Sequence, residues 1–239
     1  MGRKYNFYAG PAILPEPVLE QLQHDIRDYR GTGVSLIETS HRSKEYDAVH
    51  NRAIDLLRSL FSVPETHEIL FLGGGATMQF GMVPMNFLSG GSCDFTLTGA
   101  WAKKALADAK LYGDVELLFD GSREGFTTLP DPASIKPSDG ARYLHLTSNE
   151  TIGGLQWKEF PKGGSVPLVA DMSSDIMSRP VDLAPFGLVY AGAQKNLGPA
   201  GVTVVINRKD MLEQEGDGVP AYLRYSTHAE KNSLYNTPP

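Results

Sequence analysis

Residues 190–201 read Tyr-Ala-Gly-Ala-Gln-Lys-Asn-Leu-Gly-Pro-Ala-Gly, and this stretch decides the fold. It holds one lysine, Lys195, among small residues, and apolar runs at 186–190 and 202–206 flank it. Small residues let a backbone approach a ligand closely. A lysine in an apolar pocket has a lowered pKa, so its free amine can form an imine with an aldehyde. The alternative is a tight loop between two strands that carries a solvated lysine.

An acidic residue, Asp171, ends the apolar run 166–170 and lies 24 residues before Lys195 (195 − 171 = 24). The carboxyl end of a buried strand is where open α/β sheets bind ligands. An acid at one strand end and an imine-forming lysine at another predict a pyridoxal phosphate site. In such a site the acid pairs with the pyridinium nitrogen and the lysine holds the aldehyde. Asp171 could also cap a helix, and the two roles are compatible.

Strands and helices alternate from about residue 68 to residue 215, which predicts an α/β fold. We expect a mostly parallel, seven-stranded sheet with helices on both faces, a three-layer sandwich. The expected strands are 68–72, 93–98, 115–119, 143–146, 166–170, 186–190 and 202–206. The expected helices are 16–29, 44–60, 78–87, about 101–111 and 209–215.

A glycine loop, Gly73–Gly75, lies between an expected strand and an expected helix, and Ala76 and Thr77 follow it. Strand, glycine loop and helix together form a phosphate cradle. His41 and Arg42 lie just before the helix 44–60, where they could bind an anion or remain solvated.

Two further strand ends carry ligand-binding candidates. Trp101 follows the strand 93–98 and could stack on a planar ring, or it could belong to the core. Thr151 or Asn149 follows the strand 143–146 and could reach a ligand hydroxyl, or form a turn. Side chains from several strand ends therefore converge on one edge of the predicted sheet.

Composition narrows the class of protein. The chain has 239 residues and a net charge of −6, from 22 basic and 28 acidic residues, with no basic cluster that would bind nucleic acid. The single cysteine, Cys93, excludes an intramolecular disulfide and fits a reducing compartment. No stretch approaches the ~20 apolar residues of a membrane helix, and the histidines lack metal-ligand spacing. We expect a soluble, cytoplasmic protein without a metal.

The chain resembles the phosphoserine aminotransferase family, a class V group of fold-type I pyridoxal-phosphate-dependent aminotransferases. The motifs that carry this resemblance run from end to end of the chain. They are Asn6-Phe-Tyr-Ala-Gly-Pro-Ala12, Ser40-His-Arg-Ser43, Gly73-Gly-Gly75, Asn149-Glu-Thr151, Ala170-Asp-Met-Ser-Ser174, Ala193-Gln-Lys-Asn196 and Tyr235-Asn-Thr-Pro-Pro239.

The resemblance implies a role for each matched residue. Lys195 attaches pyridoxal 5'-phosphate and later moves the proton, Asp171 holds the pyridinium, and Trp101 stacks on the ring. Thr151 bonds the phenolic oxygen side of the ring. The residues implied at the cofactor phosphate are Gly75, Ala76, Thr77 and Gln194 and, from the neighbouring subunit of a homodimer, Asn236 and Thr237. His41 and Arg42 are implied to act across the dimer at the substrate phosphate.

The resemblance also implies an activity and a domain layout. The activity is transfer of an amino group between glutamate and 3-phosphohydroxypyruvate, which gives O-phospho-L-serine and 2-oxoglutarate in serine biosynthesis and also serves pyridoxine biosynthesis. Residues 1–15 are expected to be an arm that joins the small lobe, and residues 16–239 the cofactor-binding large domain. Relatives continue past Pro239 into a small C-terminal domain that is absent from this chain, so we expect it to turn over substrate poorly or not at all.

Three alternatives to this activity are open at this point. Another fold-type I enzyme, such as a cysteine desulfurase, would need a reactive cysteine, and Cys93 begins an expected strand. A Rossmann-like nucleotide-binding protein could use Gly73–Gly75, with Asp94 as the acidic residue that holds the ribose. An inactive binding domain is a third alternative.

Overall fold

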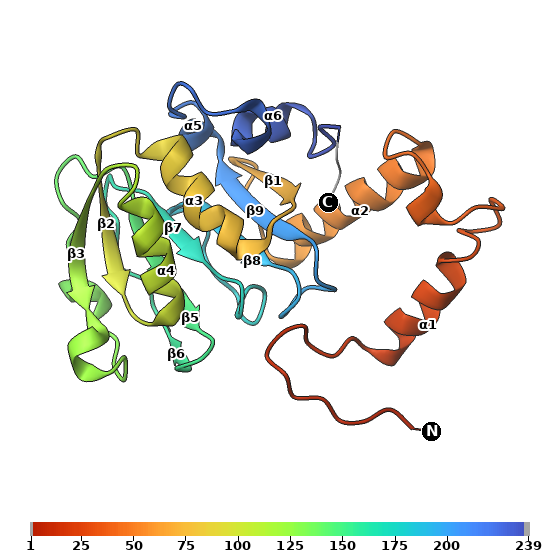
Figure 1. Cartoon of the computed structure of the whole chain (residues 1–239), viewed down its shortest axis with the longest axis horizontal. Helices are drawn as coiled ribbons and strands as arrows, with labels where there is room; N and C mark the ends of the chain where they lie inside the picture. Colours follow the sequence, from red (N-terminus) through yellow and green to blue (C-terminus); the bar gives the residue numbers. More distant parts are fainter. Residues whose placement is uncertain (1, 237–239) are drawn as a thin grey trace.

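A seven-stranded sheet forms the centre of the computed structural model, which describes residues 2–236 (Figure 1). The strand order is β1-β9-β8-β7-β4-β2-β3. The strands are β1 (His67–Leu72), β2 (Ser92–Leu97), β3 (Asp114–Asp120), β4 (Leu144–Thr147), β7 (Leu168–Asp171), β8 (Phe186–Gly192) and β9 (Thr203–Arg208). Strand β9 runs antiparallel to both of its neighbours, and the other pairs are parallel. The predicted seven-stranded, mostly parallel sheet is therefore confirmed.

Helices and long connections cover the two faces of this sheet. The α-helices are α1 (Glu16–Asp25), α2 (Lys44–Leu60), α3 (Gly75–Phe87), α4 (Ala100–Ala109), α5 (Lys209–Leu212) and α6 (Tyr225–Glu230). The short 3-10 helices are η1 (Leu36–Glu38), η2 (Gly121–Glu124), η3 (Pro132–Ser134) and η4 (Ala221–Leu223). Helices α3 and α4 lie on the face that carries Val169 and Leu188. The end of α2 and the connections lie on the face that carries Leu168 and Ala170.

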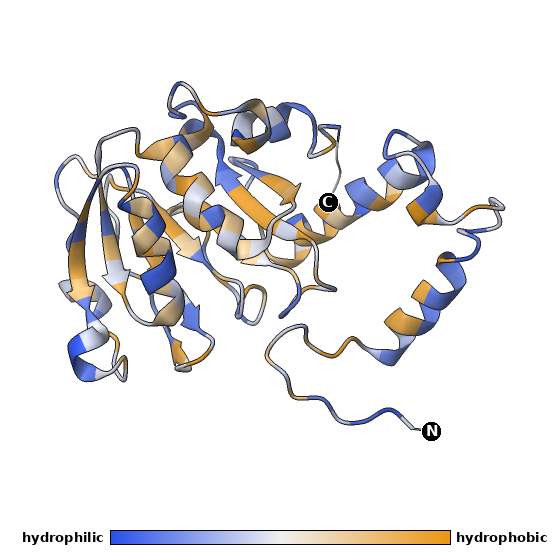
Figure 2. Cartoon of the chain, in the orientation of Figure 1, coloured by the Kyte–Doolittle hydropathy of each residue, from blue (hydrophilic) through white to orange (hydrophobic). Residues whose placement is uncertain are grey.

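Successive side chains of a strand point to opposite faces of the sheet, which explains this layering. Both faces of the central strands are buried, so these strands read as continuous apolar runs, and Figure 2 shows them mainly as hydrophobic segments. Strand β8 is buried along its whole length, from Phe186 to Gly192. The sheet therefore provides a rigid frame for the loops at its edge.

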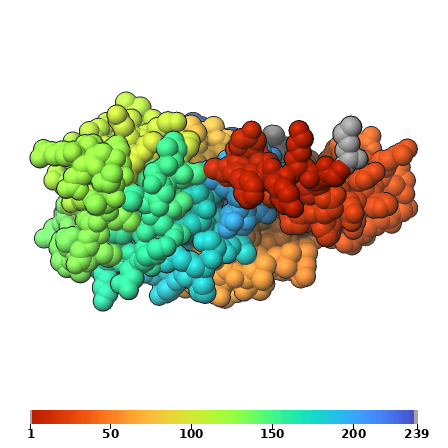
Figure 3. All heavy atoms as spheres, turned by 90° about the horizontal axis from the view of Figure 1, so that it is seen from below, coloured from red at the N-terminus to blue at the C-terminus, as the bar shows by residue number. Residues whose placement is uncertain are grey.

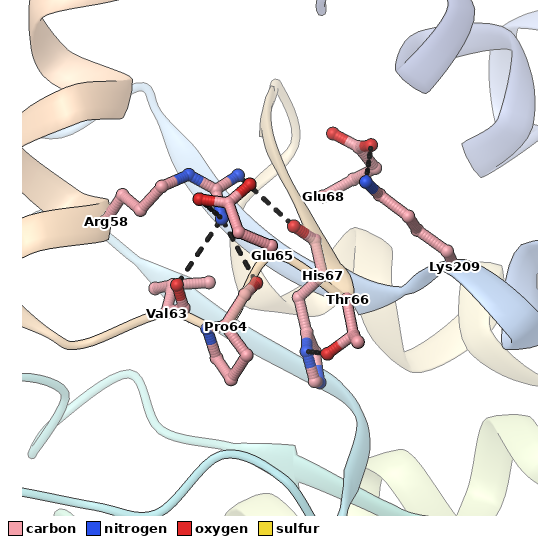
Figure 4. A network of polar contacts seen from close by, with 8 residues as sticks. All are labelled: Arg58, Val63, Pro64, Glu65, Thr66, His67, Glu68 and Lys209. Atoms are coloured by element: carbon pink, nitrogen blue, oxygen red, sulfur yellow. Dashed lines mark hydrogen bonds and ion pairs between the residues drawn. The ribbon is translucent and has the colours of Figure 1, made fainter.

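Helix α2 begins and ends as predicted, and the side chain of Arg58 fixes its C-terminal end. The Arg58 guanidinium donates hydrogen bonds to the carbonyl oxygens of Val63 (3.4 Å), Pro64 (3.1 Å) and His67 (3.2 Å) (Figure 4). Because His67 opens β1, these bonds tie the end of α2 to the edge strand that leads into the glycine loop.

Several local predictions differ from the structure, among them the helix expected at 209–215, which ends at Leu212. Helix α1 ends at Asp25 rather than near residue 29, and Arg30 adopts a left-handed φ of 52°. Helix α3 begins at Gly75, three residues earlier than expected, because the glycine loop itself opens the helix. The hairpin of β5 (Asn149–Glu150) and β6 (Leu155–Gln156) was missed, and so was α6.

The N-terminal segment, residues 2–15, is an extended arm that precedes α1. Figure 3 shows it lying across the molecule beside the blue segments of the C-terminal half. The backbone amide of Ala12 donates to the carbonyl oxygen of Gln194 over 2.8 Å, so the arm contacts the loop that carries Lys195. None of the helices within residues 2–236 combines the length and the apolar character needed to cross a bilayer.

Candidate active site

The carboxyl ends of the parallel strands bring the predicted site residues to one edge of the sheet. Strands β1, β2, β7 and β8 point the same way, because β1 and β8 both run antiparallel to β9. Gly73–Gly75, Trp101 and Lys195 follow β1, β2 and β8 in the chain, and Asp171 is the last residue of β7. The predicted convergence is confirmed.

Lys195 lies half-buried at the centre of this edge. Its Nζ donates a hydrogen bond to Oγ1 of Thr151 over 2.5 Å and lies 5.1 Å from the centroid of the Trp101 ring. Burial lowers the pKa of Lys195, and the negative charges of Asp171 and Glu150 act in the opposite direction. A lowered pKa leaves more of the amine unprotonated near neutral pH, as imine formation requires.

Asp171 closes strand β7 and is almost fully buried, with 5% of its surface exposed. Its Oδ1 accepts a hydrogen bond from the backbone amide of Ser173 over 2.9 Å and so closes a turn; because no helix lies between β7 and β8, the expectation that Asp171 caps a helix is wrong. Burial raises the pKa of Asp171, whereas the Ser173 hydrogen bonds and the positive charge of Lys195 lower it. A buried carboxylate in this position is suited to pair with a cationic ring nitrogen.

The glycine loop gives α3 an open N-terminus. Gly74 (φ 87°) and Gly75 (φ 66°) are left-handed, and a Cβ on Gly74 would come within 2.6 Å of Cβ of Met78. Position 74 therefore requires glycine, because its backbone is left-handed and because a Cβ would clash with Met78. The first amides of a helix have no partner within the helix, so those of Gly75, Ala76 and Thr77 can face an anion.

These residues fit pyridoxal phosphate. The indole Nε1 of Trp101 is buried without a hydrogen-bond partner among the described residues, and so is Oγ1 of Thr203. Thr203 pairs with Gly192 and with Leu72, so its side chain belongs to the same edge of the sheet. An edge that combines a half-buried amine, a buried acid, an aromatic ring and a helix N-terminus supplies a partner for each part of that cofactor. Within residues 2–236, no three His, Cys, Asp or Glu side chains are arranged to hold a metal ion.

A second group of predicted residues gathers near the start of α2. The guanidinium of Arg42 donates to Oδ1 of Asn236 over 3.4 Å, although the two residues are 194 positions apart. Nε2 of His41 is buried and has no partner among the described residues. Within residues 2–236, no hydrogen bond or ion pair joins this group to Lys195 or Asp171. Its role across a dimer interface stays a prediction, and Thr237 lies outside the described residues.

The sequence did not single out Glu150 or Gly10, which contact the site from other segments. Glu150 accepts hydrogen bonds from the start of α4. Gly10 lies against the Lys195 side chain. Both belong to motifs of the resemblance, Asn149-Glu-Thr151 and Asn6–Ala12, which were the only available signals.

Comparison with known proteins gives the family. Residues 4–238 match the family model described as aminotransferase class-V. The chain belongs to the aminotransferase class-V family. Within this family it is 55% identical to a phosphoserine aminotransferase of Niallia circulans over 238 residues, and 52% identical to one of Bacillus subtilis (strain 168) over 240 residues. The alignments cover 99% and 100% of this chain and 66% of each relative, so the chain spans about two thirds of their length.

Solved structures of this family have the same fold. A phosphoserine aminotransferase from Bacillus circulans subsp. alkalophilus superposes with a TM-score of 0.96 at 55% identity, over 99% of this chain and 66% of that one. A phosphoserine aminotransferase from Trichomonas vaginalis, described as bound to PLP, gives 0.93 at 38% identity, over 99% of this chain and 71% of that one. The predicted fold-type I architecture is confirmed.

The structure disfavours a cysteine desulfurase and a Rossmann-like nucleotide-binding protein. Cys93 is fully buried and burial raises its pKa to about 12, so it cannot serve as the nucleophile of a desulfurase. Asp94 lies inside β2 and accepts a hydrogen bond from the amide of Ser138 over 2.7 Å. Four strands separate β2 from β1, which precedes the glycine loop. Asp94 therefore cannot hold the ribose of a nucleotide bound at Gly73–Gly75.

Proposed function

We propose that this chain carries the reaction site of a phosphoserine aminotransferase. The reaction is amino transfer between glutamate and 3-phosphohydroxypyruvate, which gives O-phospho-L-serine and 2-oxoglutarate. The observation that carries the proposal is the position of the half-buried Lys195 amine, hydrogen-bonded to Thr151 and next to Trp101, at the edge where Asp171 ends β7. The identity of 55% to a phosphoserine aminotransferase supports it.

The proposed cofactor is pyridoxal phosphate, which when bound supplies an electron-withdrawing ring next to the substrate amine. The Lys195 amine attaches it and later moves the proton. The Asp171 carboxylate keeps positive charge at the ring nitrogen, Trp101 covers one ring face, and Thr151 orients Nζ. The amides at the start of α3 hold the phosphate, together with the side chain of Gln194.

The proposed assembly is a homodimer in the cytoplasm. In it, His41 and Arg42 bind the substrate phosphate across the interface, and Asn236 and Thr237 reach the cofactor phosphate of the partner. Arg42 suits this role because a guanidinium binds phosphate through paired hydrogen bonds. Residues 16–239 form the cofactor-binding domain in this proposal, with residues 1–15 as the arm.

The experiment is a product assay. The purified protein is mixed with pyridoxal phosphate, glutamate and 3-phosphohydroxypyruvate, and phosphoserine is measured by mass spectrometry. We expect slow formation of phosphoserine by the wild-type protein and none by Lys195→Ala, with hydroxypyruvate as the control substrate that lacks the phosphate. Absence of phosphoserine with the wild type, or equal amounts with Lys195→Ala, would overturn the proposal.

A further inference from the structure

Glu150 is a buried carboxylate that no part of the proposed reaction uses. Only 1% of its surface is exposed. Its oxygens accept hydrogen bonds from the backbone amides of Trp101 (3.1 Å) and Ala102 (3.0 Å) and from Oγ1 of Thr98 (3.4 Å). Helix α4 has Gly99 at its N-cap position, where no side chain can cap it. A residue 48 positions along the chain therefore supplies the cap of this helix, and its negative charge suits a helix N-terminus.

The cap leaves no room for a side chain at Gly99. A Cβ on Gly99 would lie 2.4 Å from Cδ of Glu150. The φ of Gly99 is 172°, an extended value that any residue can adopt, so space and not backbone conformation requires glycine here. Gly99 and Glu150 thus form a matched pair in which the missing side chain of one makes room for the carboxylate of the other.

The carboxylate lies between two segments that both touch Lys195. On one side it binds the backbone of Trp101, whose ring centroid is 5.1 Å from Nζ of Lys195. On the other side it immediately precedes Thr151, whose hydroxyl accepts from Nζ over 2.5 Å. The amide of Gly154 donates to the carbonyl oxygen of Glu150 over 2.7 Å and closes the turn that carries Thr151. Movement of this one side chain would therefore shift two partners of the reactive amine.

We propose that Glu150 is a positioning residue that fixes Trp101 and Thr151 at their distances from Lys195, and so sets the geometry in which the cofactor is held. The proposal rests on the proposed function in treating Lys195 as the reactive amine. Glu150 touches neither Lys195 nor the reacting atoms. Its charge also acts on Lys195, since it raises the pKa of the amine against the effect of burial.

Glu150→Gln tests the proposal, and Glu215→Gln is the matched control. Glu215 also caps a helix from a distance, because its carboxylate accepts from the amide of Ser226 (2.8 Å), at the start of α6. Glu215 follows α5, beyond the end of β9, which lies at the opposite edge of the sheet because β9 is antiparallel. The two variants therefore make the same change, from glutamate to glutamine in a helix cap, at opposite edges of the sheet.

Three measurements give the outcome. In the cofactor-free protein, we expect hydrogen exchange of the Trp101 and Ala102 amides to be roughly tenfold faster in Glu150→Gln, because a charge-assisted cap is lost. We expect the pKa of Lys195, read from the pH dependence of its reaction with an amine reagent, to fall. The pKa should fall because Asp171 and Glu150 are the two negative groups that raise it, and the variant removes one of them. Pyridoxal phosphate should bind roughly tenfold more weakly, and Glu215→Gln should leave all three unchanged.

Unchanged exchange at Trp101 and Ala102, or faster exchange with an unchanged Lys195 pKa and cofactor affinity, would overturn the proposal. If Glu150→Gln does not fold, Gly99→Ala displaces the same carboxylate and should produce the same faster exchange and weaker binding. A wild-type protein that binds no pyridoxal phosphate would count against the proposed function. The exchange and the Lys195 titration, both made without cofactor, would still decide the role of Glu150.

Discussion

Gly10 lies directly against the side chain of Lys195: a Cβ on Gly10 would come within 2.9 Å of Cγ of the lysine. The adjoining hydrogen bond from the amide of Ala12 to the carbonyl oxygen of Gln194 (2.8 Å) holds the arm in this position. The two segments are more than 180 residues apart in the chain. The N-terminal arm therefore forms one wall beside the Lys195 side chain.

Replacing Gly10 with valine should disturb Lys195. The added side chain meets the middle of the lysine stem, so either the arm or the lysine must move, and overpacking of this kind costs about 1–3 kcal/mol. We expect pyridoxal phosphate to bind at least about fivefold more weakly, as measured by fluorescence titration. Gly2→Val is the control, since nothing lies within 4 Å of a Cβ at Gly2. Equal affinities of the two variants would show that the arm does not constrain the site.

Asp171→Asn should preserve the fold and slow the reaction. Asparagine can still accept the hydrogen bond from the Ser173 amide, but it has no charge to pair with the ring nitrogen. Loss of one electrostatic partner at a reaction site lowers the rate about 10²–10³-fold, and the phosphoserine assay measures it. Asp182→Asn is the control, because exposed Asp182 makes the same bond to the amide two residues on, Ala184 (3.0 Å). Similar rates in both variants would remove Asp171 from the reaction.

His145 should make the protein sensitive to acid. It is buried in β4, with Nε2 hydrogen-bonded to the hydroxyl of Tyr190 over 2.9 Å, and burial lowers its pKa to about 3 from an ordinary 6.5. Below pH 6.5 the unfolded chain binds a proton that the folded protein does not. The free energy of unfolding therefore falls as the pH falls from about 6.5 to about 3, by up to about 1.4 kcal/mol per pH unit for this group.

His145→Gln should flatten this dependence. Between pH 6 and pH 4, urea unfolding should show a slope of stability against pH that is smaller by about 1.4 kcal/mol per unit than in the wild type. His50 and His67, whose pKa values burial also lowers, contribute equally to both proteins and cancel in the difference. Exposed His24, replaced by glutamine, is the control and should leave the slope unchanged. An unaltered slope in His145→Gln would mean that this histidine is protonated in the folded protein.

The sheet could be predicted from the sequence because buried parallel strands are uninterrupted apolar runs. Strand β8 was expected at 186–190 and extends two residues further, to Gly192. Boundaries set by distant contacts were harder to predict. The start of α4 depends on Glu150, and no local pattern around Gly99 reveals a cap that comes from another segment. Helix α6 was missed because it is only six residues long and its own N-cap residue, Arg224, supplies no side-chain cap.

In the site, too, residues placed by a local pattern could be predicted, and residues placed by distant contacts could not. Lys195, Asp171 and Trp101 could be predicted because each lies at or just after the end of a strand, and parallel strands end at one edge of a sheet. Thr151 was a candidate from its position alone, and its contact with Lys195 required the β5–β6 hairpin, which the sequence did not indicate. The contact of Gly10 with Lys195 depends on where the N-terminal arm lies, and the sequence of the arm has no hydrophobic periodicity that would predict this.

The most direct test of the account is covalent capture of the cofactor on Lys195. The purified protein is incubated with pyridoxal phosphate, reduced with borohydride, digested, and mapped by mass spectrometry, with Lys195→Ala and Lys104→Ala treated in parallel. Lys104 is the control because its Nζ also lies over the Trp101 ring, 4.5 Å from the centroid. We predict one modified peptide, carrying the reduced cofactor on Lys195, present in Lys104→Ala and lost in Lys195→Ala. Modification at Lys104, or an unchanged level of modification in Lys195→Ala, would contradict the account.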